Sequence, residues 1–455
     1  MNEELAEHLI NYSLTTGADF SEIFYENFQN RSITFLNNKI DKVNTSYAEG
    51  VGIRLALKDN ILYADTNTIT KENLTKIITK LKDNFNSKPK LENVVLKSAG
   101  KKRQYTDMTD KDKKEFLETI NKIAREYDKR VIEVKIVFDI LKKEIIIANS
   151  LGKYITEDRN YTGVRISITV SENDKVEKSS EMYRFFDDTS FIKKIDLETE
   201  IKKIVDSAIN KLKAVYIKGG KMPVILESGF GAVIFHEACG HAMEATAVAK
   251  NLSVLNGKLG KKIASKKVTI IDDGTIPNLW GTTTYDDEGN KTRKNILIKN
   301  GILKSYLVDY LNDRQMKHGL TGSSRRQNFR FAPTSRMNNT YLAPGTDKIA
   351  DMFKNIKYGL YAKKLGGGSV DTATGDFNFL VEEGYLIKNG KIATPVKMAS
   401  LIGNTLEILS NVEMVSDDLK YSSGGCGSES GWVPVTIGQP TVKISSILVG
   451  GASND

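Results

Sequence analysis

The sequence predicts an α+β protein with two domains. Residues 1–220 are expected to form an N-terminal mixed α/β domain with antiparallel sheets and packed helices. Residues 221–455 are expected to form a mainly antiparallel β domain that carries a His-Glu-x-x-x-His helix. Three observations predict this: segments with a period of two and segments with a helical period follow one another twice in the first half, two Asn-Gly pairs punctuate the second half, and 455 residues suffice for two or three domains.

The first elements are set by their hydrophobic periods. A helical stripe predicts a helix over Asn2–Thr15, and alternation over residues 33–63 predicts an antiparallel meander with one wet face. Helical spacing returns and predicts a helix over Lys71–Phe85, packed on that sheet. The polar, lysine-rich stretch Asn86–Gln104 is expected to be a connection.

The same order then recurs. A helix is expected around Phe116–Ile123, strands over Val134–Ile140 and Val164–Val170, and a helix over Leu197–Leu212. Glycines 219 and 220 before Pro223 indicate the boundary at residue 220. Strands followed by helices, twice over, are typical of an α+β domain.

The second half is rich in strand and turn signals. Asn300-Gly301 and Asn389-Gly390 both have alternating apolar flanks, which is the strongest short-range hairpin signal. Phe377, Phe379 and Val381 add another strand. Periodicity does not distinguish a sandwich from a barrel.

Composition excludes several classes of protein. The formal charge is +9, but lysines and acids alternate along most of the chain, so no nucleic-acid partner is expected. No run approaches 18 apolar residues and the start is acidic, which predicts a cytoplasmic protein with no membrane partner. Two cysteines, Cys239 and Cys426, exclude a disulfide framework, and two free thiols are expected.

The chemistry-bearing segment holds two of the four histidines. His236 and His241 lie five residues apart with Glu237 after the first, following an apolar run typical of a strand. Imidazoles are zinc ligands, and a glutamate beside a ligand can accept a proton from water. Two hydrogen-bonded helix histidines are the alternative interpretation of the pair.

The five-residue spacing predicts irregular backbone. On a regular helix five residues turn about 500°, so the two imidazoles would diverge by about 140°. A π-type turn of about 82° per residue would reduce the offset to about 50°. We therefore expect irregular backbone between Glu237 and Ala242, with Gly240 easing the distortion or ending the helix.

A third ligand is needed, and Cys426 is a candidate because it lies between glycines in a segment without a helical period. A small buried thiol is the alternative for Cys426. Cys239 is expected to face the core. His8 and His318 are expected to be surface or satisfied polar residues.

Other candidates are weaker. Asp272-Asp273 and Asp286-Asp287-Glu288 are interpreted as turns, because their acids are adjacent and lack the alternate spacing of a calcium loop. Gly366-Gly367-Gly368 suggests a bend or a close backbone approach. Arg325-Arg326 fits either a substrate carboxylate or a solvated or structural pair.

The residues resemble the TldD/PmbA family of metalloproteases, TldD type. HEACGHAMEA is similar to its His-Glu-x-x-x-His segment. Further blocks that resemble the family run along almost the whole chain: GADFSEIFYE, EGVGIRLAL, DDGTIPNLWGTTTYDDEG, TGSSRRQNF, PTSRMNNTYL, GGGSVDTATGDFNF, LIGNT and CGSESGWVPVTIGQPTV.

The resemblance implies a zinc ion held by His236, His241 and Cys426, with Glu237 as general base. It implies a peptidase that cuts peptides or unfolded protein segments, as a homodimer or paired with a metal-free PmbA/TldE-type relative. One departure is visible: the family usually has Cys-Gly-Lys-x-Gly-Gln, where this chain has Cys426 followed by Gly-Ser-Glu-Ser-Gly. The rival hypothesis is a non-catalytic peptide-binding or modulator subunit with a structural metal.

Overall fold

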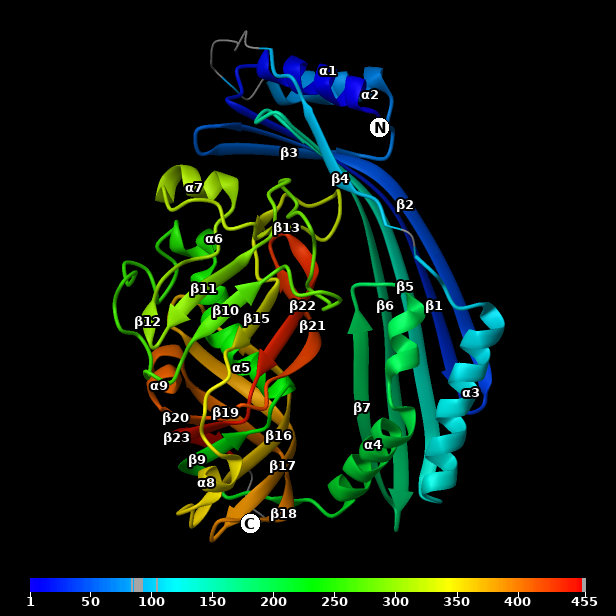
Figure 1. The fold of residues 1–455 in the computed structure, drawn as a ribbon, viewed down its shortest axis with the longest axis vertical. Coiled ribbons are helices and arrows are strands. Elements are labelled where there is room, and N and C mark those ends of the chain that lie inside the picture. Colours follow the sequence, from blue (N-terminus) through cyan, green and yellow to red (C-terminus); the bar gives the residue numbers. More distant parts are fainter. Residues whose placement is uncertain (83–84, 86–92, 104, 452–455) are drawn as a thin grey trace.

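The structure is a computed structural model that describes residues 1–455 except 83–84, 86–92, 104 and 452–455. A long curved sheet from the first half of the chain stands beside a lobe built from the second half (Figure 1). The α+β class predicted from the sequence is confirmed. The division at residue 220, at the first residue of β9, stays a prediction.

The N-terminal sheet has the order β3-β2-β1-β5-β6-β4, and β7 pairs with β6. Its first three strands form the expected antiparallel meander, but the face expected to be wet is covered over residues 50–56, which are all buried where they meet the lobe. The parallel pairing of β4 with β6 was not expected, since β4 lies in the segment interpreted as a connection. The strands are β1 (Phe20–Leu36), β2 (Lys39–Leu57), β3 (Asn60–Thr66), β4 (Lys97–Lys101), β5 (Val131–Asn149), β6 (Lys153–Glu172) and β7 (Lys175–Phe185).

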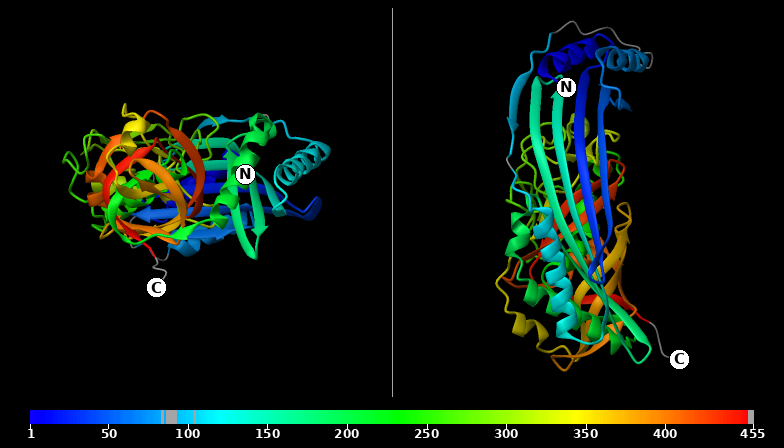
Figure 2. Two further views of the ribbon diagram at one scale, coloured as in Figure 1. Left: turned by 90° about the horizontal axis from the view of Figure 1, so that it is seen from below. Right: turned by 90° about the vertical axis from the view of Figure 1, so that its right-hand side faces the viewer.

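Two helix pairs cover this sheet at opposite ends (Figures 1 and 2). Each pair presents an apolar face to the strands, giving two separate clusters of buried side chains. The helix predicted over Lys71–Phe85 is present from Lys71, and residues 83–84 lie outside the described part, as do 86–92 and 104 of the expected connection. The helices are α1 (Glu3–Leu14), α2 (Lys71–Lys82), α3 (Asp110–Tyr127) and α4 (Leu197–Leu212), with a 3₁₀ turn at Thr189–Lys194.

The second half forms a six-stranded and an eight-stranded sheet, largely antiparallel, with the small β13–β14 pair (Ser324–Arg325, Thr334–Ser335). The six-stranded sheet has the order β12-β11-β10-β15-β22-β21. Its strands are β10 (Ile270–Asp273), β11 (Lys294–Lys299), β12 (Ile302–Leu303), β15 (Asn339–Leu342), β21 (Lys420–Ser428) and β22 (Gly431–Gln439).

The eight-stranded sheet curves round beneath the rest of the lobe, as the view from below shows (Figure 2). Short helices, α7 (Tyr310–Met316), α8 (Ile349–Phe353) and α9 (Thr405–Ser410), link strands of the lobe. The strands of this sheet are β8 (Val215–Tyr216), β9 (Gly220–Leu226), β16 (Tyr358–Val370), β17 (Asp376–Lys388), β18 (Lys391–Lys397), β19 (Ala399–Asn404), β20 (Val412–Val415) and β23 (Val442–Gly450).

Both Asn-Gly hairpins are confirmed. Asn300 and Gly301 join β11 to β12, and Asn389 and Gly390 join β17 to β18. All four residues have positive φ, between 48° and 81°, which is the backbone that a two-residue type I′ turn requires. The turns therefore fix the register of both hairpins.

The curved sheet and the lobe meet through buried charges. Arg54 of β2 lies 2.7 Å from Glu22 of β1 and 2.6 Å from Glu288 of the lobe, and Arg326 of the lobe also pairs with Glu22. We call these four residues the charge cluster. None of its side chains is more than 2% exposed, so the contact is dry.

No helix among the described residues combines the length and apolar character needed to cross a bilayer.

Candidate metal centre

The His-Glu-x-x-x-His segment lies inside the lobe as three successive turns of different pitch. One α-turn, Val233–Phe235 (α5), leads into a π turn over His236–Gly240, and a 3₁₀ turn follows over His241–Met243. The irregular backbone expected from the spacing is confirmed. The wider π turn brings both imidazoles to one side, with ring centroids 5.3 Å apart and planes at 80°.

Gly240 ends the π turn, as expected, but not through its backbone freedom. Its φ of −57° is ordinary helical backbone that any residue adopts. A Cβ at this position would overlap the Sδ of Met337, whose side chain packs directly against the turn. The glycine is therefore required by close packing against the strand β15 region and not by a strained conformation.

Cys426 lies far along the chain from the two histidines but close to them in space. It lies on β21, an edge strand of the six-stranded sheet, and its side chain is buried. Its Sγ is 3.2 Å from Nε2 of His241. One ligand atom from each of His236, His241 and Cys426 can be chosen so that all lie within 4.8 Å of one another. The Cys426 thiol and the two imidazoles, 185 or more positions away in the sequence, thus converge on one point.

The two ring nitrogens of His236 are buried without hydrogen-bond partners among the described residues. The whole residue is 3% exposed. A buried polar group left unpaired costs about 1–3 kcal/mol, and such groups in native proteins call for a specific explanation. A cation between the imidazoles and the thiol would satisfy His236, so the donor set fits a metal.

Glu244 fixes the orientation of the His241 ring. The ring Nδ1 lies 2.9 Å from Oε2 of Glu244, which is itself buried, so Nε2 points toward Cys426. A carboxylate on the far nitrogen of an imidazole fixes ring orientation in metal sites. Glu244 is a residue that the motif spacing did not identify.

The electrostatics of the set favour a thiolate. Burial opposes ionisation of Cys426, but His241 and His236 outweigh it and hold the pKa of this thiol well below its usual range. Burial likewise acts to lower the pKa of His241, but Glu244 and Cys426 raise that pKa well above its usual value. The ionised sulfur is the form in which cysteine ligates metals.

Glu237 stands beside the ligand atoms. Its Oε2 is 3.5 Å from Nε2 of His241, the same nitrogen that faces Cys426. The Glu237 side chain is 24% exposed, more than that of His241 at 12%, so it lies on the more open side of the site. A carboxylate in this place can exchange a proton with a water molecule next to the set.

Arg336 connects the turn that carries His241 with the strand that carries Cys426. It is fully buried, and its guanidinium donates to the carbonyl of Cys426 at 2.6 Å and to Ser430 Oγ at 2.9 Å. Its Nε lies 3.7 Å from Oε1 of Glu244. One side chain therefore contacts both the carboxylate behind His241 and the backbone of Cys426. The sequence signal for it was weak: it lies in PTSRMNNTYL, one of the resembling blocks.

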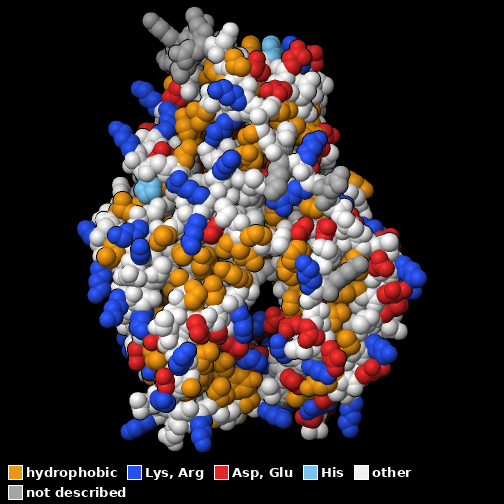
Figure 3. Space-filling view, viewed as in Figure 1, with side chains coloured by type: hydrophobic (Ala, Val, Ile, Leu, Met, Phe, Trp, Pro, Cys, Tyr) orange, Lys and Arg blue, Asp and Glu red, His pale blue; other side chains and the backbone are white. Residues whose placement is uncertain are grey.

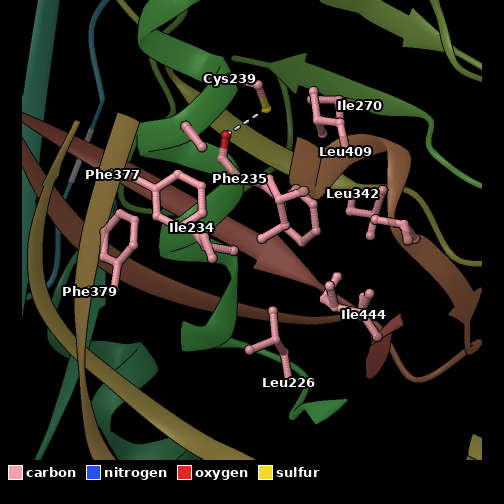
Figure 4. Packing of buried hydrophobic residues seen from close by; sticks show 14 of the residues in the cluster. Leu226, Ile234, Phe235, Cys239, Ile270, Leu342, Phe377, Phe379, Leu409 and Ile444 are labelled. Atoms are coloured by element: carbon pink, nitrogen blue, oxygen red, sulfur yellow. Dashed lines mark hydrogen bonds between the residues drawn. The ribbon is translucent and has the colours of Figure 1, made fainter. Parts of the chain in front are cut away.

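The remaining cysteine and histidines are outside the set. Cys239 faces the core as predicted: it is fully buried and its Sγ donates to the carbonyl of Phe235 at 2.7 Å (Figure 4). His8 is exposed and stacks on Tyr12, and His318 contacts Ser305. These placements match their interpretation as core or satisfied polar residues.

The other candidates have structural roles. The turn predicted at Asp272-Asp273 is wrong: both residues lie in β10, and Asp272 accepts hydrogen bonds from Asn338 and Thr340. Gly368 in β16 lies so close to Phe379 that a Cβ would overlap the ring. Residues 286–289 form a turn, but a buried one whose Glu288 belongs to the charge cluster. Arg326 belongs to the same cluster, so residues 325–326 are a structural pair and not a solvated one.

The α+β fold brings together a His-His-Cys donor set whose atoms suit a soft or borderline metal ion. The chain belongs to the PmbA/TldA metallopeptidase family: the models of its domain 1, central domain and C-terminal domain match residues 21–84, 103–214 and 219–451.

Relatives and solved structures agree with this assignment. The chain is 35% identical to "Metalloprotease TldD homolog" of Buchnera aphidicola subsp. Acyrthosiphon pisum (96% of this chain, 94% of the relative) and 28% identical to "Zinc metalloprotease TldD homolog" of Saccharolobus solfataricus (96% and 97%). The fold is similar to that of TldE from Thermococcus kodakarensis, with a TM-score of 0.77 and 22% identity over 98% of this chain and 100% of that one.

Proposed function

We propose that this protein is a zinc-dependent peptidase that cleaves peptides or unfolded protein segments. The observation that carries the proposal is the convergence of His236, His241 and Cys426 within 4.8 Å, with the carboxylate of Glu237 beside them. Relatives named metalloproteases, one of them a zinc metalloprotease, support the reaction class and the metal.

Three residues would hold the ion: His236 and His241 through imidazole nitrogens and Cys426 through its thiolate. Two imidazoles and a thiolate suit zinc, and three protein ligands leave a fourth position open, as in catalytic zinc sites. When bound, zinc supplies Lewis acidity toward the scissile carbonyl and lowers the pKa of water. Glu244 and Arg336 keep the His241 ring and the Cys426 backbone in place.

Glu237 performs the proton transfers in this proposal. Its carboxylate takes a proton from the attacking water and later delivers it to the leaving amine, so that the C–N bond breaks without releasing an amide anion. A structural metal needs no such group, which argues against the rival proposal of a non-catalytic modulator subunit. The partial exposure of Glu237 gives water a route to it.

The edge strand supplies a place for the substrate backbone. β21, which carries Cys426, pairs with β22 on one side only, among the described residues. An extended peptide can add to such an edge through main-chain hydrogen bonds. Because a folded segment cannot offer a free backbone, we propose unfolded substrates with loose sequence preference.

The assembly and the compartment are part of the proposal. A homodimer, or a pair with a PmbA/TldE-type relative, is supported by the similarity to TldE, and a cytoplasmic location is consistent with the sequence analysis. No nucleic acid is required by the reaction.

Changing Glu237 to Gln tests the proposal. We expect cleavage of an unfolded fluorogenic peptide to fall by about 10²–10⁴-fold while the zinc content is unchanged, since the base is lost and the ligands remain. The exposed Glu118→Gln variant, far from the site, is the matched control. Bound zinc without chelator-sensitive cleavage in the unaltered protein would favour the structural-metal subunit.

A further inference from the structure

The positive charge of this chain is concentrated on one side of the C-terminal lobe. Residues 245–271 and 289–308 together contain eleven Lys and Arg and no Asp or Glu. Since the whole chain carries +9, subtracting these eleven leaves −2 for all other residues. Basic side chains gather along the left edge of the lobe, over β12 and the loop before β10 (Figure 3).

The two segments are held together, so the lysines form one surface. The N–H of Gly260 donates to the carbonyl of Leu303 at 2.8 Å, and the N–H of Leu303 donates to that of Lys261 at 3.1 Å. Ile263 binds the Gly301 carbonyl of the β11–β12 turn. We call the basic face the surface formed by Lys258, Lys261, Lys262, Lys266, Lys299 and Lys304.

The basic face contains a hollow of about 340 Å³. Lys258, Lys261 and Lys262 line it, its apolar wall comes from Ile263, Ala264 and Leu406, and Ser410 of α9 adds a hydroxyl. Three ammonium groups around one depression repel one another unless anions lie between them.

Few of these charges are compensated inside the protein. Of the eleven cations, two form ion pairs with carboxylates among the described residues: Lys267 with Asp347 at 2.7 Å and Lys250 with Glu429 at 3.9 Å. None of the six lysines of the basic face does. A group of lysines without ion pairs, on segments that contain no acid, in a chain whose remainder is slightly negative, is a site for an anionic partner.

We propose that the basic face binds acidic, extended polypeptide segments. Ten of the eleven cations are lysines, point charges that suit scattered carboxylates, whereas phosphate recognition favours the bidentate guanidinium of Arg. The aromatic side chains that stack on bases are missing: the one aromatic residue of the two segments is the buried Tyr306. Exposed aliphatic side chains, Leu252, Leu259 and Ile296, lie among the lysines and suit the apolar residues of a peptide.

The basic face and the Cys426 strand lie at opposite edges of the six-stranded sheet, whose outermost strands are β12 and β21. Lys250 follows α6 (Ala245–Val248), which comes directly after the turn carrying His241, and it pairs with Glu429 in the turn between β21 and β22. This pair links the lysine-rich segments to the β21–β22 turn, but the six lysines of the basic face lie away from the metal centre. Resting on the peptidase function proposed above, the basic face is then a docking site outside the metal centre that favours acidic unfolded polypeptides as substrates.

Binding can be measured without cleavage. The probe is a fluorescein-labelled 16-residue peptide, (Glu-Ala-Glu-Leu)₄, titrated by fluorescence anisotropy with the full-length Glu237→Gln protein; (Gln-Ala-Gln-Leu)₄ is the neutral comparison. The test variant adds Lys258→Gln, Lys261→Gln and Lys262→Gln. The matched control adds Lys357→Gln, Lys388→Gln and Lys391→Gln, which remove the same charge from the β17–β18 hairpin region.

We expect the test variant to bind the acidic peptide at least about tenfold more weakly, the control variant to bind it as tightly as the parent, and binding to fall as salt rises. Equal affinity of parent and test variant, or of the acidic and neutral peptides, overturns the proposal. So does tighter binding of a single-stranded oligonucleotide or of phosphatidylserine vesicles at the same lysines. Circular dichroism of both triple variants verifies folding. If the acidic peptide binds as predicted but the unaltered protein cleaves no peptide, the peptidase proposal fails and the binding proposal stands.

Discussion

Two buried polar clusters of this protein can be compared directly. In the charge cluster, Arg54 faces Glu22 and Glu288, and Arg326 faces Glu22, so every charge meets an opposite charge supplied by the chain. In the candidate metal centre, His236 is as deeply buried, yet neither of its ring nitrogens has a hydrogen-bond partner among the described residues.

The difference separates a structural cluster from a functional one. A buried charge network whose members neutralise one another needs nothing from outside and holds two parts of the fold together. Buried ligand atoms without hydrogen-bond partners destabilise the folded protein unless a ligand binds them. The comparison predicts that substitutions in the charge cluster change folding stability, whereas those in the metal centre change metal affinity.

The largest effect on metal is expected for Cys426→Ser. Removing one of the three ligands should weaken zinc on the order of a thousandfold, because a fully ligated zinc contributes about 10–16 kcal/mol. Zinc affinity would be measured by competition with a chromophoric chelator. Cys239→Ser removes the other buried thiol and should leave zinc affinity unchanged; a similar loss in both variants would contradict the assignment.

The largest effect on stability is expected for Arg54→Met. This change leaves Glu288 buried without its cation and Glu22 with Arg326 alone, so the free energy of unfolding should fall by about 3–5 kcal/mol in urea titrations. Arg31→Met breaks the partly exposed pair with Asp110, where we expect a change of about 1 kcal/mol or less. If Arg54→Met instead altered zinc affinity in the folded protein, the separation between the two clusters would fail.

Arg336→Met should give an intermediate effect on metal. It removes the contact that joins Glu244 to the Cys426 backbone, and loss of such supporting groups typically weakens metal binding 10–100-fold. Ser430→Ala removes one acceptor of the same guanidinium and should weaken zinc about threefold or less. The absorption spectrum of the cobalt-substituted protein would report whether the thiolate still ligates.

The smallest effect is the pH dependence of the charge cluster. Burial, with Asp309 and Glu22 nearby, raises the pKa of Glu288 from 4.5 to about 8, against the opposing effect of Arg54. The unfolded chain thus releases this proton near pH 4.5 and the folded chain near pH 8, so stability falls as pH rises between them.

Glu288→Gln isolates that contribution. We expect the loss of unfolding free energy between pH 5 and 8 to shrink on the order of 1 kcal/mol in the variant, since one pKa unit corresponds to about 1.4 kcal/mol and the neighbouring acids titrate together. Urea midpoints of both proteins across this range would show it, and identical pH profiles would remove Glu288 as the cause.

Regular elements could be predicted from the sequence because they are local. Alternating apolar residues predicted the strands of the β1–β3 meander, although residues 50–56 are buried on both faces because the lobe covers one of them. The two Asn-Gly pairs determined their turns through their own φ angles. β4 was missed because five residues, Lys97–Lys101, carry no period, and their strand form depends on parallel pairing with β6.

For the site, the sequence alone determined the irregular turn. His236 and His241 are five positions apart, so the backbone must turn less per residue than a regular helix if both rings are to share one side, and this is a property of backbone geometry. The tertiary structure decided the rest. It brought Cys426 and Arg336 to that turn and left the His236 ring nitrogens without hydrogen-bond partners among the described residues. Contacts between distant segments depend on how sheets and turns pack and leave no spacing in the chain.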